Sequence, residues 1–252
     1  MSLSPAQWHQ RFSLQAGWTQ DLRQHLYPRT GLNQAARVLD VGCGTGALQA
    51  ELIEQSRAQV HGLDLNPRFL LQAAQNSPSG QYVVGDAHAL PYANASFDIT
   101  LCHFLLLWVE SQEGVLSEMR RVTRPGGALM ALAEPDYGGR IDHPPELAEI
   151  GLLQAGSLRQ QGAQPEMGRR LVGLFSNLGL QTVETGVLGA QWSGPPLPEE
   201  LASEWAVIRS DLRDMLSKEQ LDKLQEMEAQ AWARRERVLF VPTFYAWGRV
   251  PE

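Results

Sequence analysis

Residues 36–47 read ARVLDVGCGTGA, and they decide the fold of this 252-residue chain. The first half, ARVLDV, is an apolar run with the length of a buried strand, and it stops at a cluster of glycines. The next residues, ALQAELIEQ (47–55), are expected to form a helix. Glycines between a strand and a helix let the backbone turn tightly and let a ligand approach the main chain, and the helix start offers free N–H groups. The segment therefore predicts a ligand-binding turn.

The rest of the chain repeats this strand-then-helix pattern up to about residue 135. Strands that alternate with helices every 20–30 residues form βαβ units with a parallel sheet, and the handedness of the crossovers places helices on both faces. From residue 144 the pattern becomes mainly helical, and two further strands follow. Besides 36–41, we expect strands at 59–65, 81–86, 97–106, 128–135, 181–192 and 238–250, with a linker at 193–198.

The bulk composition is that of an ordinary globular protein and narrows the function classes. A formal net charge of -7 disfavours nucleic acid as a partner, because proteins that bind nucleic acid need basic surfaces. The two cysteines and the N-terminal sequence, which lacks a signal-peptide pattern, lead us to expect a cytoplasmic location. The most apolar run, 99–109, is too short to span a bilayer, so no membrane insertion is expected. The six histidines are dispersed, and no metal site is predicted.

Acidic residues stand at the ends of three successive expected strands. They are Asp40, Asp64 and Asp86. Because ligands of open α/β sheets bind at the carboxyl ends of the strands, these side chains are expected to line one crevice. A carboxylate at Asp64 can accept both hydroxyls of a ribose, and one at Asp86 can accept a hydrogen bond from an adenine amine.

Two different ligands are compatible with the glycines alone. Gly42, Gly44 and Ala47 fit the dinucleotide fingerprint GxGxxG/A, with Asp64 as the ribose acid, so an NAD-dependent oxidoreductase has to be considered. Asp40 argues against it, because a carboxylate beside a pyrophosphate is repelled. That carboxylate suits a ligand with an ammonium group.

Four ordered blocks resemble a known family, the class I S-adenosylmethionine-dependent methyltransferases, and most of all its ubiquinone/menaquinone branch. The blocks are VLDVGCGTGALQAEL, HGLDLNP, VVGDAHALPYANASFDIT and RRVTRPGGALMALAEP, and together they span roughly residues 36–134. The resemblance implies a Rossmann-like α/β fold with a seven-stranded, mostly parallel sheet, helices on both faces and an antiparallel last strand. The helical pattern that begins at Ser4 and Pro5 leads us to expect an N-terminal helical cap over 1–34, followed by a methyltransferase domain over 35–252.

The resemblance further implies a role for each residue of the cofactor site. Asp40 would orient the methionine amino group through the loop, and Asp64 would hold the ribose. The N-terminal helix would fold over the cofactor and its aromatic side chains would exclude water. The other implied contacts are Gly42, Cys43 and Gly44 along the cofactor, Leu65 on the adenine, Asp86 with Ala87 at the adenine edge, Arg11 at the methionine carboxylate, and His103 beside the methyl group.

The implied reaction is transfer of a methyl group from S-adenosylmethionine to a small-molecule acceptor, with S-adenosylhomocysteine as product. An in-line displacement is accelerated mainly by positioning, and a base is needed only if the acceptor must lose a proton; His103 is the candidate. A non-methylating protein that binds the same cofactor is the remaining alternative. Glu134, Asp136 and Tyr137 are candidates for the acceptor pocket. The helical elements at 144–180 and 199–236 are expected on the substrate side, the latter as a substrate cover or a homodimer contact.

Overall fold

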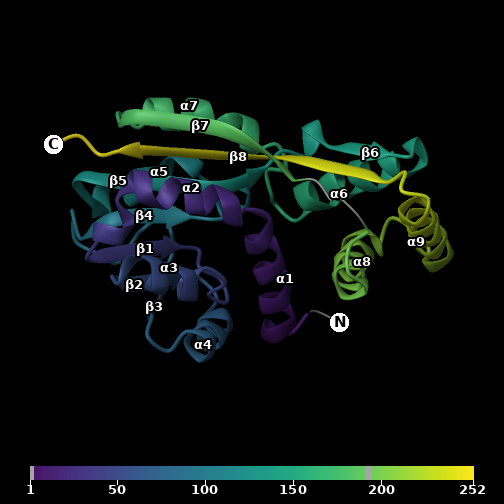
Figure 1. Ribbon diagram of the computed structural model, residues 1–252, viewed down its shortest axis with the longest axis horizontal. Helices are drawn as coiled ribbons and strands as arrows, with labels where there is room; N and C mark the ends of the chain where they lie inside the picture. Colours follow the sequence, from purple (N-terminus) through teal and green to yellow (C-terminus); the bar gives the residue numbers. More distant parts are fainter. Residues whose placement is uncertain (1–2, 191–194) are drawn as a thin grey trace.

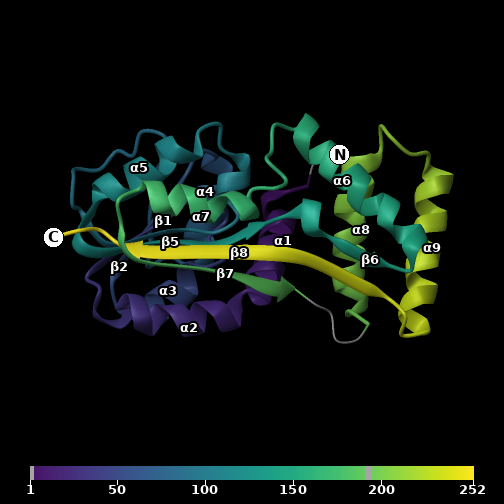
Figure 2. The same cartoon turned by 90° about the horizontal axis from the view of Figure 1, so that it is seen from above.

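The computed structural model describes residues 3–190 and 195–252, which form a twisted mixed sheet with helices on both faces (Figures 1 and 2). The strand order is β3-β2-β1-β4-β5-β8-β6, and β7 pairs with the other side of β8. The strands are β1 (Arg37–Val41), β2 (Gln59–Asp64), β3 (Gln81–Val84), β4 (Phe97–Cys102), β5 (Thr123–Pro135), β6 (Ile141–His143), β7 (Gln181–Ala190) and β8 (Val238–Arg249).

The expected Rossmann-like fold is confirmed, and the expected number of strands is corrected. The first five strands are parallel, and the last strand, β8, runs antiparallel to β5 and to β7. The described sheet has eight strands instead of seven, because the three-residue strand β6 pairs with the start of β8. β8 is long enough to extend beyond β5, and its free edge accepts this short addition. Gln191 and Trp192 of the expected strand 181–192, and part of the linker, lie outside the described residues.

Nine α-helices are described over 3–190 and 195–252, and most of them cover the sheet. In Figure 2, α2 and α3 lie on one face and α5 and α7 on the other, each burying its apolar side in one of two core clusters. The helices are α1 (Pro5–Trp18), α2 (Gln20–Thr30), α3 (Gln49–Ser56), α4 (Pro67–Asn76), α5 (Gln112–Val122), α6 (Ala148–Gln160), α7 (Leu171–Asn177), α8 (Pro198–Leu212) and α9 (Lys218–Ala233).

The N-terminal helix α1 begins at a capping box that the sequence signals. Ser4 accepts a hydrogen bond from the backbone N–H of Gln7, the Gln7 side chain returns to the backbone of Ser4, and Pro5 occupies the first helical position. α1 stands apart from the layered helices, across the end of the sheet (Figure 1).

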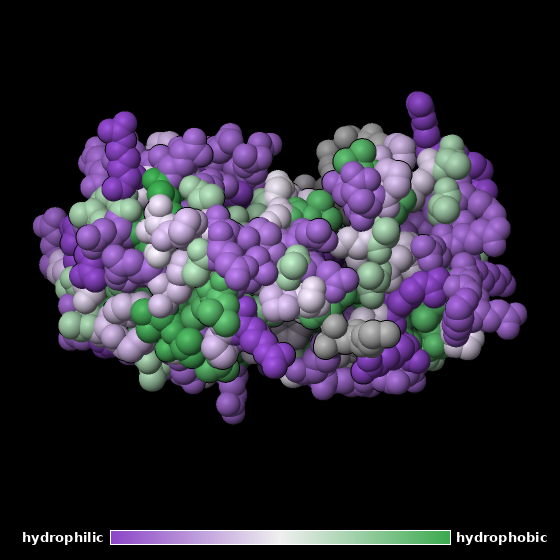
Figure 3. Space-filling model, turned by 90° about the horizontal axis from the view of Figure 1, so that it is seen from below, coloured by the Kyte–Doolittle hydropathy of each residue, from purple (hydrophilic) through white to green (hydrophobic). Residues whose placement is uncertain are grey.

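A second helical group lies at the far end of β8. α6, α8 and α9 share an apolar cluster that includes Leu147, Trp205 and Leu221, separate from the two clusters on the sheet. The space-filling view in Figure 3 shows the sheet and this helical group as two lobes joined by a waist. No helix within the described ranges has the length and hydropathy needed to cross a membrane.

Candidate active site

The glycine loop after β1 has the backbone geometry that only glycine adopts easily. Gly42, Gly44 and Gly46 all have positive φ angles, of 73°, 55° and 79°. The backbone N–H groups of Gly42 and Cys43 donate to the carbonyl oxygen of Leu63 at 2.7 and 3.0 Å, which ties the loop to β2. The loop is therefore a rigid turn at the carboxyl edge of the sheet.

Two carboxylates beside this loop have no cationic partner. Asp40 is buried and accepts a hydrogen bond from the Gln49 side-chain amide at 3.0 Å. Asp64 accepts hydrogen bonds from the backbone N–H groups of Gly44 and Asn66, both at 2.8 Å. Burial raises the pKa of Asp40 to about 7 and also raises the pKa of Asp64. Within the described residues neither acid forms an ion pair, so the pair suits a ligand with a positive charge and hydroxyl groups.

One cavity of about 500 Å³ begins at these acids and extends to α6, α8 and β8. Of the ten cofactor residues expected from the sequence, seven line it, and Leu65, Asp86 and Ala87 do not. The seven that line the cavity are Arg11, Asp40, Gly42, Cys43, Gly44, Asp64 and His103.

The expected adenine residues lie at the same sheet edge, outside this cavity. The backbone N–H of Gly85 donates to the carbonyl of Asp64 at 3.1 Å, which places the end of β3 beside the end of β2. Asp86 is exposed and accepts two hydrogen bonds from His88, one from its backbone and one from its ring, which lower the pKa of Asp86. Leu65 is 72% exposed. Their roles toward adenine stay predictions.

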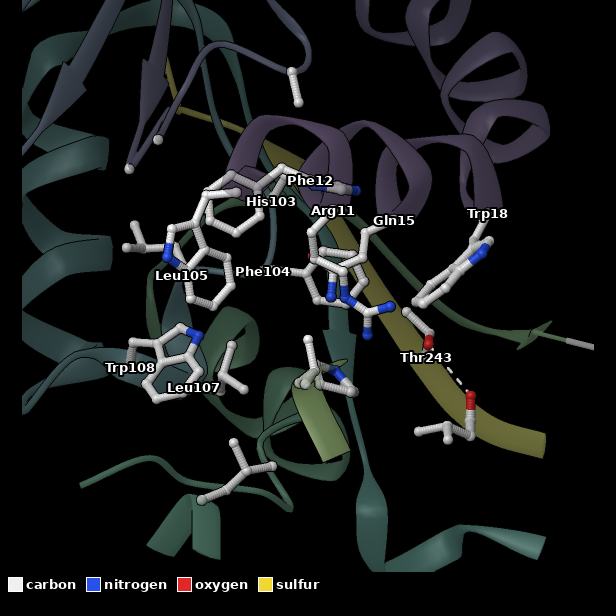
Figure 4. Close-up of a pocket in the computed structure, with 18 of the residues that line it drawn as sticks. Arg11, Phe12, Gln15, Trp18, His103, Phe104, Leu105, Leu107, Trp108 and Thr243 are labelled. Atoms are coloured by element: carbon white, nitrogen blue, oxygen red, sulfur yellow. Dashed lines mark hydrogen bonds between the residues drawn. The ribbon is translucent and has the colours of Figure 1, made fainter. Parts of the chain in front are cut away.

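α1 forms one wall of the cavity (Figure 4). Trp8 and Phe12 stack with their ring centroids 5.3 Å apart, and Phe12 meets Phe69 of α4 edge-on at 5.8 Å. His9 lies within hydrogen-bond distance of the Thr45 hydroxyl, at 3.0 Å. The helix is thus attached to the glycine loop, and its aromatic side chains border the cavity. The sequence analysis did not predict Phe69 as a cavity residue. Its position in the first turn of α4, just after Asn66-Pro67, is the sequence signal that could have indicated it.

Arg11 also lines the cavity, and its guanidinium pairs with a distant acid. It forms an ion pair with Glu204 of α8 and lies over the ring of Trp18, 5.3 Å from the ring centroid. In Figure 4, Arg11, Gln15 and Trp18 extend from α1 toward the space bordered by β8. The expected contact of Arg11 with a methionine carboxylate remains a prediction.

His103 follows β4 and is held neutral. Its Nε2 lies 2.9 Å from the hydroxyl of Thr19, and burial, together with the nearby positive charge of Arg23, lowers the pKa of His103 to about 3. Arg23 donates to the Thr19 oxygen at 2.7 Å, and the Thr19 hydroxyl has two acceptors for its one proton, the carbonyl of Ala16 at 3.2 Å and Nε2 of His103. A ring nitrogen with so low a pKa takes up a proton poorly at neutral pH, which disfavours the predicted base role.

The three residues predicted to line the acceptor pocket, at the end of β5 and just after it, have different surroundings in the structure. Glu134 is buried under the cavity wall and accepts hydrogen bonds from the backbone N–H groups of residues 105–107. Asp136 is buried and pairs with Arg169. Only Tyr137 lines the cavity, so the sequence interpretation is wrong for Glu134 and Asp136. Both acids are instead used to stabilise loops that shape the site.

The far wall of the cavity comes from the region that the sequence described only coarsely. It includes Arg140, Gln154 and Gln161 near α6, Glu204 and Asp211 on α8, and Thr243 on β8. α6 and α8 therefore border the cavity, whereas α7 packs against β7 and β8. No sequence signal distinguished these side chains from ordinary surface residues. No cluster of three or more potential metal ligands occurs in the described part of the chain.

Comparison with known families agrees with this geometry. Residues 39–131, which carry the glycine loop and the acids, match the model of the methyltransferase domain family. The chain contains a class I S-adenosylmethionine-dependent methyltransferase domain. S-adenosylmethionine is the cofactor of this domain, and the two carboxylates without cationic partners fit a cofactor with a sulfonium and an ammonium group. The dehydrogenase interpretation of the loop is not supported.

The methyltransferase domain has sequence relatives over about half of their length. Malonyl-acyl-carrier-protein O-methyltransferase of Erwinia pyrifoliae is 37% identical over 126 residues, which are 49% of this chain and 45% of that protein. Demethylmenaquinone methyltransferase of Renibacterium salmoninarum is 35% identical over 127 residues, 50% of this chain and 53% of that protein. The chain thus spans about half the length of these curated relatives.

A solved structure with the same fold covers most of the chain. The phosphoethanolamine N-methyltransferase 2 of Haemonchus contortus, in complex with phosphomonomethylethanolamine and S-adenosylhomocysteine, superposes with a TM-score of 0.59 at 18% identity. The match covers 92% of this chain and 53% of that one. It confirms that the methyltransferase domain has the expected fold.

Proposed function

We propose that this chain transfers the methyl group of S-adenosylmethionine to a small-molecule acceptor bound in the same cavity. One observation carries the proposal: a single cavity joins the glycine loop and its two acids to a second region between α1, α6, α8 and β8. A cofactor at the loop and an acceptor in the second region would share this cavity.

The residues around the loop hold the cofactor by charge and by shape. When bound, S-adenosylmethionine supplies an electrophilic methyl group on a sulfonium. The ionised carboxylate of Asp40 attracts positive charge from its buried position, and Asp64 presents oxygens at the end of β2. The positive φ angles of Gly42 and Gly44 allow the main chain to approach closely.

The site accelerates methyl transfer by positioning the two reactants and by excluding water. The aromatic side chains of α1 and of the segment after β4 line the cavity, among them Phe12, Trp18 and Trp108. Holding two reactants in line inside one cavity replaces a bimolecular encounter by an intramolecular one. The neutral His103 is suited to orient a ligand through a hydrogen bond.

The names of the relatives do not identify the methyl acceptor of this chain. Malonyl-acyl-carrier protein and demethylmenaquinone appear in the names of proteins whose matches cover only about half of this chain, 49% and 50%. The second region of the cavity is built mainly from residues after 134. The acceptor must therefore be deduced from this chain's own side chains. A homodimer through 199–236 and a cytoplasmic location stay predictions.

Calorimetric titration with S-adenosylmethionine and S-adenosylhomocysteine tests the proposal, with NADH as competitor. We expect micromolar binding of both compounds, no effect of NADH, and at least tenfold weaker binding to the Asp64→Asn variant. Asp21→Asn, an exposed acid on α2, is the matched control and should bind like the original chain. Binding of NADH in place of the sulfonium compounds would show that the loop serves a dehydrogenase.

Methyl transfer itself is then measured by mass spectrometry of acceptor mixtures incubated with the protein and the cofactor. A mass increase of one methyl group on an acceptor, absent from the Asp64→Asn reaction, supports the enzyme. Tight cofactor binding without transfer to any acceptor would favour the non-methylating alternative.

A further inference from the structure

The region of the cavity between α6, α8 and β8, called here the acceptor half, contains several charged and polar side chains beside its apolar ones. Charged groups are costly to bury unless they are paired. A charged side chain of the acceptor half that has no partner of opposite charge therefore indicates the charge of the ligand.

Both cations of the acceptor half are already neutralised. Arg11 pairs with Glu204, and both side chains are nearly buried, at 9% and 14% exposed. Arg140 donates to both carboxylate oxygens of Asp142 at 2.6 and 3.1 Å, and also to the side-chain oxygen of Gln154 at 2.6 Å. Neither guanidinium is available for an anionic ligand without breaking an ion pair.

Asp211, in the last turn of α8, is the acid that remains. Its carboxylate accepts one long hydrogen bond, from the side-chain amide of Gln161 at 3.4 Å, and it forms no ion pair among residues 3–190 and 195–252. Burial raises the pKa of Asp211 and the neighbouring carboxylate of Glu204 adds to this, whereas the hydrogen bond from Gln161 and the positive charge of Arg11 oppose it. The net charge of the acceptor half is thus one negative charge, located at Asp211.

Tyr137 lies close to the same group of charges and supplies a second polar contact. Tyr137 lines the cavity within electrostatic range of Arg11, Glu204 and Asp211, and no hydrogen bond of its hydroxyl is formed within the described part of the chain. Aromatic rings attract cations through their faces, and the Trp18 ring, which borders the same space, already lies under the Arg11 guanidinium, 5.3 Å from the ring centroid.

We propose that the acceptor half binds a small cationic molecule, with its ammonium group at the carboxylate of Asp211 and beside the hydroxyl of Tyr137. This inference rests on the proposed function, since the cation is the methyl acceptor or a part of it. Asp211 acts as a binding residue, and the transferred methyl group needs no step at its carboxylate. The common volume of about 500 Å³ for cofactor and acceptor keeps the acceptor small.

Three probes that differ mainly in charge test this inference: benzylammonium, benzyl alcohol and benzoate. Each is titrated by ligand-observed NMR into the protein saturated with S-adenosylhomocysteine, at pH 7.5. We expect benzylammonium to bind at least tenfold tighter than benzyl alcohol, and benzoate to bind most weakly. In the Asp211→Asn variant the preference should fall to within about twofold, because a neutral amide no longer attracts the cation. Tyr137→Phe should weaken benzylammonium several-fold.

Asp214→Asn is the matched control, because Asp214 follows the same helix and is 88% exposed, paired only with Arg213. It should leave the preference unchanged. Retained binding of S-adenosylhomocysteine shows that each variant is folded. If that compound binds and the original chain does not prefer the cation, or Asp211→Asn keeps the preference, this inference is wrong and the proposed function stands. If the compound does not bind at all, the proposed function itself is wrong.

Discussion

Arg11 on α1 forms an ion pair with Glu204 on α8, across 193 positions of the sequence. The pair joins the first helix of the chain to the helical group at the far end of β8, over the cavity between them. Because both side chains are nearly buried, the pair links the closure of the cavity to the stability of the fold.

Removing Arg11 should therefore destabilise the protein more than removing Glu204. Arg11→Met leaves Glu204 without its partner and beside a second carboxylate, Asp211, and we expect a loss of about 3 kcal/mol in the free energy of unfolding. Glu204→Gln leaves Arg11 free to interact with Asp211, so the loss should be smaller. Urea unfolding at pH 7.5 measures both. Asp214→Asn, at an exposed pair, should change stability by no more than about 0.5 kcal/mol. Equal losses for the two variants would contradict the charge arrangement described.

The raised pKa of Asp40 predicts a pH dependence of stability with a definite sign. Burial raises that pKa from 3.8 to about 7, so the folded protein holds this proton more tightly than the unfolded chain. The resulting stabilisation is fully present below pH 3.8 and is lost as the pH rises to about 7. Asp64 contributes in the same direction. Urea unfolding between pH 5 and 8 should show a weaker pH dependence for Asp40→Asn than for the original chain; identical profiles would show that Asp40 is not the group responsible.

Cofactor affinity should change with pH in the opposite direction. Protonated Asp40 is neutral and no longer attracts a cation, so S-adenosylmethionine should bind up to about tenfold tighter at pH 8 than at pH 6. The groups that face Asp40 are Gln49, Asp64 and Arg23. Titration of the cofactor's own amino group is common to all variants, so comparison with Asp40→Asn by calorimetry isolates the contribution of this acid. A variant with the full pH dependence would contradict it.

Gly44 is predicted to be irreplaceable for two independent reasons. Its φ angle is 55°, and a Cβ atom there would lie 3.1 Å from the ring of Phe12. Gly44→Ala should cost about 1–2 kcal/mol of stability and weaken S-adenosylhomocysteine binding at least tenfold, because α1 must shift from the loop. Gly173→Ala is the matched control: Gly173 lies in α7 with no atom within 4 Å of an added Cβ. It should raise stability by up to about 1 kcal/mol and leave affinity unchanged.

His103 should stay neutral over the pH range in which the protein is folded. With a pKa of about 3, against an ordinary value of 6.5, its ring is expected to stay uncharged well below pH 6.5. Nitrogen chemical shifts in ¹⁵N-labelled protein, followed against pH, report the protonation of the ring, and the signal is assigned from its absence in His103→Gln. A titration midpoint near 6.5 would revive the base role predicted from the sequence.

The cofactor half of the site could be predicted from the sequence because its signals are local. Gly42, Gly44 and Asp40 are consecutive or nearly so, and Asp64 ends the next strand, so the parallel sheet brings them to one edge by its topology alone. The aromatic face of α1 was also predictable, from Trp8 and Phe12. Leu65 and Asp86 follow the same logic, although the cavity does not reach them.

The acceptor half could not be predicted in the same way. Glu134 and Asp136 have the sequence context of pocket residues, and the structure buries both as partners of backbone N–H groups and of Arg169. The short strand β6 was missed because three residues with no apolar alternation carry no strand signal.

The sequence by itself determined the order of strands and helices, the glycine turn and the acids beside it, because each depends on neighbours within a few residues or on the handedness of βαβ units. Only the tertiary structure decided that Arg11 pairs with Glu204, that Asp211 forms no ion pair among the described residues and that Tyr137 lines the same cavity. These relationships join segments far apart in the chain, and their distances are set by how α1, α6 and α8 pack, which no local pattern encodes.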